Sequence, residues 1–218
     1  MSAQKDKEQS DNPRRPGRPR GKKAGADNRE QLMDIALMLF ARQGIARVSL
    51  NAIAKEAGVT PAMLHYYFTS REALVDRLLE ERFMPLRNRI SLAFSEYPDD
   101  PVRSLTLMVR VLAELAEQND WFAPLWMQEM IGEMPILRQH MHARFGDEKF
   151  HKMLSIITGW QESGKLNRSL SPELLITTLI SLVLVPFSRL RTDERMKNIS
   201  PDAIVRHALA IMDQGIGG

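Results

Sequence analysis

The chain has 218 residues, of which 44% are hydrophobic and 26% charged. This hydrophobic share is typical of globular proteins, so it supports a packed core and excludes wholesale disorder. The absence of cysteine excludes disulfides, thiolate metal sites and cysteine nucleophiles, and it fits a reducing cytoplasm. No apolar segment follows the N-terminus, and the longest apolar stretch, residues 174–187, is shorter than the roughly 18 residues that span a bilayer. We therefore expect a cytoplasmic protein of one or two domains without a membrane segment.

Charge is distributed unevenly along the sequence. The formal net charge is +3, but residues 1–26 alone carry eight Lys or Arg against three acids, which leaves −2 for the rest. Residues 13–23 (PRRPGRPRGKK) contain no acid, and their proline and glycine disfavour a helix. We expect residues 1–26 to be a disordered basic arm that binds nucleic acid through Arg18 and Arg20, with Arg18 of the triplet Gly17-Arg18-Pro19 entering the minor groove as in an AT-hook. A solubilising leader is the alternative.

Apolar periodicity and capping residues predict helices along the rest of the chain. The first covers about residues 28–43, opened by the capping box Asp27-x-x-Glu30 and closed by Gly44. Ser70 is expected to cap a later helix that Pro85 must bend or end. Further apolar repeats mark helices at residues 105–116, 121–131, 150–160, 174–187 and 204–212. With no convincing strand pattern, the sequence predicts an all-α protein of about nine or ten helices.

Residues 49–68 (SLNAIAKEAGVTPAMLHYYF) carry the most informative pattern. Ser49 is an N-cap for one helix, Gly58 permits the positive φ of a tight turn, and Thr60 caps a second helix that begins at Pro61. A helix, a short turn and a second short helix form a helix-turn-helix. The exposed face of the second helix, about residues 61–67, would enter a DNA major groove.

This segment resembles the TetR family of bacterial transcription regulators from about Leu32 to Leu79. The resemblance rests on FARQG at 40–44, IAKEAGV at 53–59 and YYFTSREAL at 66–74. It implies a three-helix helix-turn-helix domain at residues 27–84 and a larger helical domain at residues 85–218 that binds an effector and dimerises. It also implies a sequence-specific DNA-binding regulator, most often a repressor that a small molecule releases from its operator.

By position, the resemblance implies DNA contacts from Ser49, Asn51, Thr60, Pro61, Ala62, Met63, His65, Tyr66, Tyr67 and Arg71. Ser49, Asn51 and Arg71 would hold phosphates, and the N-terminal N–H groups of the helix that Thr60 caps suit an anion. Pro61, Ala62 and Met63 would read base edges through apolar contact with thymine methyls. An aromatic core cluster is the alternative for Tyr66 and Tyr67, while Phe68 is expected in the core.

A single short recognition helix reads too few base pairs to specify one site in a genome, so we expect a homodimer on a palindromic operator of double-stranded DNA. The apolar helices at residues 150–160 and 174–187 can supply the dimer face, and the resemblance implies a four-helix bundle of these helices. Ordinary burial within one subunit is the alternative. A binding site for an unknown effector is expected among flexible thioethers and flat indoles, although these side chains are also common in plain cores. The candidates are Met108, Trp121, Trp126, Met127, Met130, Met153 and Trp160.

Other functions find little support in the sequence. It contains no His-Glu-x-x-His, no Gly-x-Ser-x-Gly and no phosphate-binding glycine loop, so we predict no enzyme, no cofactor and no metal. His140, His142 and His151 leave open a metal sensor. A non-specific architectural DNA-binding protein that uses the basic arm, and a transcriptional activator of the same fold, are the remaining alternatives.

Overall fold

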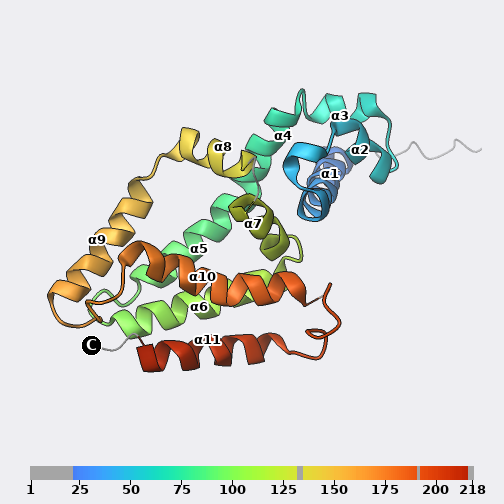
Figure 1. Ribbon diagram of the computed structural model, residues 1–218. Helices are drawn as coiled ribbons and strands as arrows, with labels where there is room; N and C mark the ends of the chain where they lie inside the picture. Colours follow the sequence, from blue (N-terminus) through green and yellow to red (C-terminus); the bar gives the residue numbers. More distant parts are fainter. Residues whose placement is uncertain (1–21, 132–134, 191, 216–218) are drawn as a thin grey trace, which may run out of the picture.

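The computed structural model describes residues 22–131, 135–190 and 192–215, and these form helices without a strand (Figure 1). The all-α prediction is confirmed. The helices are α1 (Lys22–Gln43), α2 (Leu50–Glu56), α3 (Pro61–Tyr67), α4 (Arg71–Leu78), α5 (Met84–Ser95), α6 (Pro101–Gln118), α7 (Phe122–Ile131), α8 (Ile136–Phe145), α9 (Glu148–Glu162), α10 (Pro172–Arg189) and α11 (Pro201–Gly215), with the 3-10 turn η1 (Ile45–Arg47) and the π-turn η2 (Leu79–Phe83). Arg18, Arg20 and the side chain of Met130 lie outside the described residues.

The helices gather into two connected parts (Figure 1). α1 to α4 lie at one end of the molecule, while α6, α10 and α11 pack together at the other. α1 packs against α7, so the N-terminal part is docked onto the C-terminal part. One hydrophobic core runs through both, from Phe40 and Leu64 in the first part to Met108 and Val183 in the second.

α1 begins at Lys22, before the Asp27 start that the capping box predicts. The boundary expected at residue 26 therefore lies inside this helix. The physical reason is that residues 22–28 contain no proline, and the single Gly25 costs a helix only about 1 kcal/mol. The predicted end is confirmed, because Gly44 follows α1 with a φ of +82°.

Pro85 changes the type of helix without ending it. Leu78, Leu79, Phe83 and Met84 all have right-handed helical dihedrals, so the chain stays helical from α4 into α5. At the junction of α4 and α5, in η2, the Met84 N–H donates to the carbonyl of Leu79, five residues earlier. Proline lacks the N–H that an α-helix needs and its ring crowds the preceding turn, and a π-turn at this point accommodates both effects.

α10 is longer than the apolar stretch that predicts it. Ser171 caps it by accepting from the Leu174 N–H, and the helix continues to Arg189. Among the described residues it is the one helix whose length and composition would allow it to cross a membrane, which corrects the expectation that this segment is too short. About a third of it is buried, against α6, α7 and α11. The packing explains its apolar inner face, and the outer face remains open.

Glu129 of α7 supplies the cap that α8 lacks locally. Pro135 precedes α8 and offers no side-chain acceptor, whereas the buried carboxylate of Glu129 accepts the N–H of Leu137 at 2.9 Å and that of Arg138 at 3.3 Å. Burial raises the pKa of Glu129 above its ordinary 4.5, although the two N–H donors oppose this rise. The carboxylate therefore joins α7 to α8 at some electrostatic cost.

Replacing Glu129 by glutamine is expected to flatten the dependence of stability on pH. A raised pKa in the folded state makes the contribution of Glu129 complete below 4.5, and it is lost as pH rises through the folded pKa. The unfolding free energy of the glutamine variant relative to the wild type should therefore rise with pH over that interval, measured by urea unfolding. Alanine should show the same pH trend relative to the wild type but be less stable than the glutamine variant by about 1–3 kcal/mol, because the N–H groups of Leu137 and Arg138 lose their acceptor. A glutamine-to-wild-type difference that stays constant with pH would contradict the burial of this carboxylate.

Candidate nucleic-acid interface

The turn between α2 and α3 is fixed by local chemistry. The Ser49 hydroxyl accepts the Ala52 N–H and the Thr60 hydroxyl accepts the Met63 N–H, both at 3.2 Å. Gly58 has a φ of +66°, and no neighbouring atom would touch a Cβ placed there, so its dihedral angle, and not the space around it, requires glycine. The caps predicted at Ser49 and Thr60 are confirmed, and α3 covers the predicted residues 61–67.

α3 lies on the surface with one face inward. Leu64 is fully buried, and Phe68, just after the helix, is 2% exposed, as expected for the core. The opposite face presents Tyr66, whose side chain is 82% exposed, and this excludes an aromatic core role for that ring. Tyr67 is half-buried against the core and meets the Tyr66 ring edge-on, with 5.2 Å between centroids. The outer side of this helix is also formed by Pro61, Ala62 and His65, which are exposed, with Met63 half-buried.

The hydroxyls of Ser49 and Thr60 accept backbone hydrogen bonds, which leaves each O–H free to donate to a phosphate. Asn51 is exposed on the first turn of α2. Arg71 is more constrained than its sequence position suggests. Its guanidinium donates to the carbonyl of Ala46 in η1 at 3.2 Å and lies 3.6 Å from Glu72. Arg71 therefore fastens α4 to η1, and its phosphate contact remains a prediction.

Two cations near this face were not singled out from the sequence. Arg47 in η1 and Lys55 in α2 are exposed, and neither lies within ion-pair distance of a carboxylate among the described residues. An exposed cation without an acidic partner is suited to bind phosphate. A signal was present, because Arg47 precedes the helix-turn-helix and Lys55 lies in its first helix, but pairing with an acid could not be judged without coordinates.

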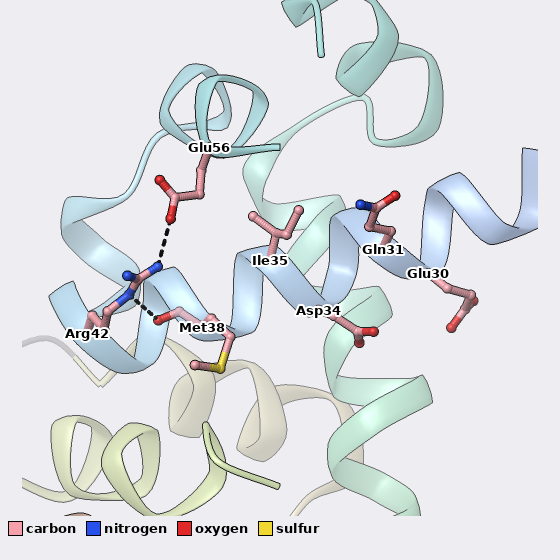
Figure 2. Close-up of a pocket in the computed structure, with 7 residues that line it drawn as sticks. All are labelled: Glu30, Gln31, Asp34, Ile35, Met38, Arg42 and Glu56. Carbon is pink, nitrogen blue, oxygen red and sulfur yellow. Dashed lines mark hydrogen bonds and ion pairs between the residues drawn. The ribbon is translucent and has the colours of Figure 1, made fainter. Parts of the chain in front are cut away.

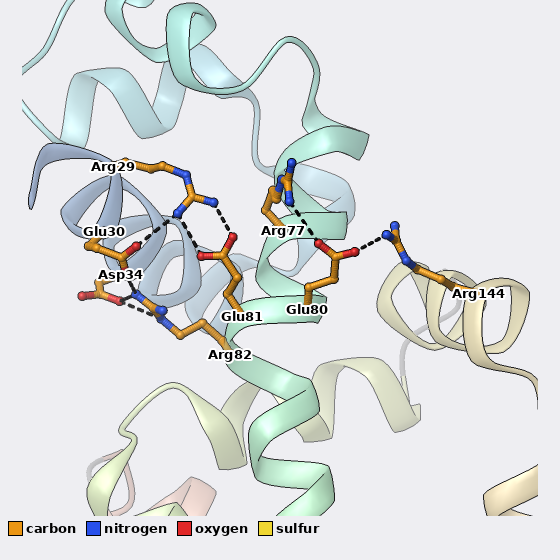
Figure 3. A network of polar contacts seen from close by, with 8 residues as sticks. All are labelled: Arg29, Glu30, Asp34, Arg77, Glu80, Glu81, Arg82 and Arg144. Carbon is orange, nitrogen blue, oxygen red and sulfur yellow. Dashed lines mark hydrogen bonds and ion pairs between the residues drawn. The ribbon is translucent and has the colours of Figure 1, made fainter. Parts of the chain in front are cut away.

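The π-turn η2 connects the N-terminal part to α8 through a charged network (Figure 3). Arg29 of α1 binds Glu81 of η2 in a two-pronged ion pair, and Arg82 of η2 binds Glu30 and Asp34 of α1. The Arg29 guanidinium lowers the pKa of Glu81, so this carboxylate stays charged at neutral pH. η2 is thereby fixed to the flank of α1.

On the opposite side, α8 is paired with α4 and η2. His140 Nδ1 lies 2.9 Å from a carboxylate oxygen of Asp76, and Arg144 pairs with Glu80 and lies 3.7 Å from Asp76 (Figure 3 shows Arg144 and Glu80). Glu80 is also held by Arg77 at 3.2 Å. These contacts tie α4, the helix that follows α3, to α8 in the C-terminal part.

The candidate effector residues do not form one site. Trp121 packs on Phe83 of η2, with 4.9 Å between ring centroids, and Phe122 continues this cluster to Trp126. Trp160 belongs to a separate contact with Phe94, and its indole N–H donates to the carbonyl of Pro98. Among the described candidates, Met108 is also buried, whereas Met127 and Met153 are half-buried. None of these residues lines the surface hollow beside α1 or the one beside the end of α9.

The histidines considered for a metal sensor are separated. His140 faces Asp76, while His142 lies 3.0 Å from Asp147. Within the described ranges, no group of three or more His, Asp or Glu side chains is arranged to hold a metal ion.

Comparison with known proteins agrees with this geometry. Residues 32–78 match the family model of bacterial regulatory proteins of the tetR family. The HTH-type transcriptional regulator AcrR of Shigella flexneri is 28% identical over 126 residues, which cover 54% of this chain and 57% of AcrR. RutR of Escherichia coli K12, also an HTH-type transcriptional regulator, is 29% identical over 150 residues, which cover 66% of each chain. The chain thus spans less than two thirds of the length of either relative.

A solved structure extends the likeness to nearly the whole fold. A transcriptional regulator from Saccharomonospora viridis in complex with choline superposes with a TM-score of 0.60 at 20% identity, covering 88% of this chain and 99% of that chain. At this identity the likeness concerns the fold alone. The matched motif lies on the surface-exposed helix pair α2–α3, and the helical body behind it has the same architecture as this regulator. Residues 32–78 therefore carry the N-terminal domain of the tetR family of bacterial regulatory proteins.

Proposed function

We propose that the protein is a cytoplasmic, homodimeric transcriptional regulator, and not an enzyme, that binds a palindromic operator and is released by a small-molecule ligand. The observation that carries the proposal is α3, whose inner residues anchor it while Tyr66 and its neighbours face solvent. A helix exposed in this way fits a major groove, and a two-fold pair of such helices matches two half-sites. Repression is the proposed outcome of binding.

Selection of bound genomic fragments by the purified protein tests this function. A regulator is expected to enrich a few discrete palindromes with half-sites about one helical turn apart. Footprinting on an enriched fragment should then protect both half-sites. Uniform recovery of fragments without a shared sequence would contradict the proposal and favour the architectural alternative.

Replacing Tyr66 by alanine is expected to weaken operator binding by about tenfold, because each good contact in such an interface is worth about 1–3 kcal/mol. Stability should hardly change, since the side chain is 82% exposed. Phenylalanine at this position separates the two parts of the tyrosine: if the hydroxyl binds a phosphate, the phenylalanine variant should lose affinity as well. Operator titrations by fluorescence anisotropy measure both variants. An alanine variant with wild-type affinity would remove Tyr66 from the interface.

The outer face of α10 supports the proposed dimer. It exposes Leu174 at 66%, together with Thr177, Thr178 and Ser181 at helical spacing, and α9 adds Phe150 at 39%. Small and apolar side chains in one stripe allow two helices to approach closely. A second copy of the same surface would cover this face.

Changing Leu174 to glutamate is expected to raise the dimer dissociation constant by about tenfold or more, because a buried leucine contributes about 1.5–3 kcal/mol. Sedimentation over a range of concentrations measures the effect. Ile211→Glu is the matched control, since Ile211 is an exposed apolar residue of α11, outside the proposed face. Equal dissociation constants for the two variants would place the dimer elsewhere.

The proposed effector site lies at the aromatic cluster of Trp121, Phe122 and Trp126. Support comes from the contact between Trp121 and Phe83, because Phe83 belongs to the π-turn η2, which directly follows α4. A ligand that displaces Trp121 would shift η2 and favour a state in which the two α3 helices no longer match the operator. The S. viridis structure of the same fold is a complex with choline, which supports a small-molecule site. Tryptophan fluorescence during a ligand screen tests the site, and a responding ligand that leaves operator binding unchanged would contradict the mechanism.

A further inference from the structure

The exposed face of α1 forms an acidic groove (Figure 2). The hollow has a volume of about 620 Å³, and Ile35 and Met38 are the apolar residues of its lining. Its three carboxylates pair with the guanidiniums of Arg42, which lines the groove, and of Arg82 in η2, and they exceed these two cations by one charge. The lining residues are Glu30, Gln31, Asp34, Ile35, Met38 and Arg42 of α1 and Glu56 of α2.

The carboxylates of this groove keep binding capacity. Asp34 is paired with Arg82, but both hydrogen bonds end on Oδ1, so within the described part of the chain Oδ2 faces solvent without a partner. Glu56 bonds Arg42 through Oε1 alone, at 2.9 Å. The side chain of Asp34 is 64% exposed and that of Glu56 is 48% exposed. A carboxylate can accept from more than one guanidinium, so a second arginine can bind at each.

The chain that precedes α1 has the complementary composition. Residues 13–20 (PRRPGRPR) contain four arginines, three prolines and no acid. Prolines favour an extended conformation and can pack on apolar side chains, and arginines have the length to reach carboxylates beside them. No other segment of the sequence has this density of positive charge.

The lengths also match. At about 1.5 Å per residue, Glu30 lies about 12 Å and Arg42 about 30 Å along α1 from Lys22. An extended segment that turns back at Gly21 advances about 3.3 Å per residue, so residue 18 reaches the level of Glu30 and residue 13 that of Arg42. The arginine segment is therefore long enough to span the groove.

We propose that residues 13–20 of the chain's own basic arm bind in the α1 groove when DNA is absent, with arginines on Asp34 and Glu56 and prolines over Ile35 and Met38. The groove thereby competes with DNA phosphates for the same arginines. This second step rests on the proposed function, in which the arm adds to DNA affinity. The docked arm would weaken DNA binding until a strong operator displaces it from the groove.

Intrachain disulfide trapping tests the docking without DNA. The chain has no cysteine, so Gly17→Cys and Gln31→Cys introduce one reactive pair without changing any charge. The matched control keeps this pair and adds Asp34→Asn and Glu56→Gln, which preserve the distance and remove the attraction. Under mild oxidation the control should form the intrachain disulfide at least about threefold more slowly, as expected when exposed ion pairs are lost. Circular dichroism verifies that both variants are folded.

Equal trapping rates in the two proteins would overturn the docking, as would a crosslink found only between separate chains. A rate that is insensitive to added salt would count against it in the same way, because the attraction is between exposed charges.

A second comparison tests the competition with DNA. Asp34→Asn with Glu56→Gln should raise operator affinity in the full chain by about threefold and leave it unchanged in a chain that begins at Lys22. The same gain in both chains would refute competition by the arm, since the effect would then be a direct one on DNA. Because trapping is measured without DNA, it stands or fails separately from the proposed function.

Discussion

Replacing Leu64 by alanine is expected to destabilise the N-terminal part of the protein by about 2–5 kcal/mol, the usual cost of removing a fully buried leucine side chain. Leu64 has no exposed surface and belongs to the core that joins α1, α2 and α3. α3 has only seven residues, too few to be stable without packing. Loss of the Leu64 side chain should therefore unfold α3 as well as lower the stability of the N-terminal part. Chemical unfolding followed by circular dichroism measures the change.

Tyr66→Ala provides the comparison for this variant. Both changes shorten a side chain of α3, but Tyr66 is exposed and should change stability by less than about 0.5 kcal/mol. Both variants should bind the operator poorly, Leu64→Ala because the helix no longer forms and Tyr66→Ala because the aromatic side chain no longer meets the DNA. A Leu64→Ala protein as stable as the wild type would contradict the inward orientation of Leu64.

The sequence predicts the helix-turn-helix well because its determinants are local. Ser49, Thr60 and Gly58 act through hydrogen bonds and dihedral angles within a few residues, and these follow from residue type and spacing. The orientation of α3 follows from the same reasoning. Leu64 and Phe68 are four residues apart and share a face, which turns Tyr66 outward.

The contacts that join the two parts of the molecule could not be predicted in this way. Arg29 and Glu81 are 52 residues apart, and His140 and Asp76 are 64 apart. Charged residues on helix surfaces have many possible partners, and only the packing of α1, α4 and α8 selects among them. The cap that Glu129 gives to α8 is also non-local, because the acceptor comes from the preceding helix.

The candidate effector site illustrates a different limit. Methionine and tryptophan at helical spacing indicate an apolar environment, but composition does not reveal which of them meet. The structure divides the tryptophans between a cluster at η2 and a contact at the end of α5. The link from Trp121 to Phe83 matters most for the proposed mechanism, because Phe83 belongs to the π-turn η2.

Removing residues 1–21 is expected to reduce operator affinity at low salt by about two orders of magnitude and to flatten its salt dependence. The truncation ends at Lys22, where α1 begins, so every described helix is retained. The expectation follows from charge: residues 27–82 carry seven Lys or Arg against eight acids, so the helix-turn-helix itself offers DNA no net attraction. The slope of log affinity against log salt should fall by about 0.9 for each phosphate that the arm would otherwise neutralise, or by roughly 4 if all four arginines bind phosphate.

Two charge variants of the full chain separate electrostatics from chain length. Changing Arg14, Arg15, Arg18 and Arg20 to glutamine should reproduce most of the truncation, because the arm acts through its guanidinium groups. Changing Lys5 and Lys7 to glutamine is the matched control, since Asp6 and Glu8 already offset these lysines. Anisotropy titrations at several salt concentrations give the slopes. If the glutamine-for-arginine protein keeps the wild-type slope, the arm does not neutralise phosphates, and the affinity of this acidic helix-turn-helix must come from groups that the described structure already contains, such as Arg47 and Lys55.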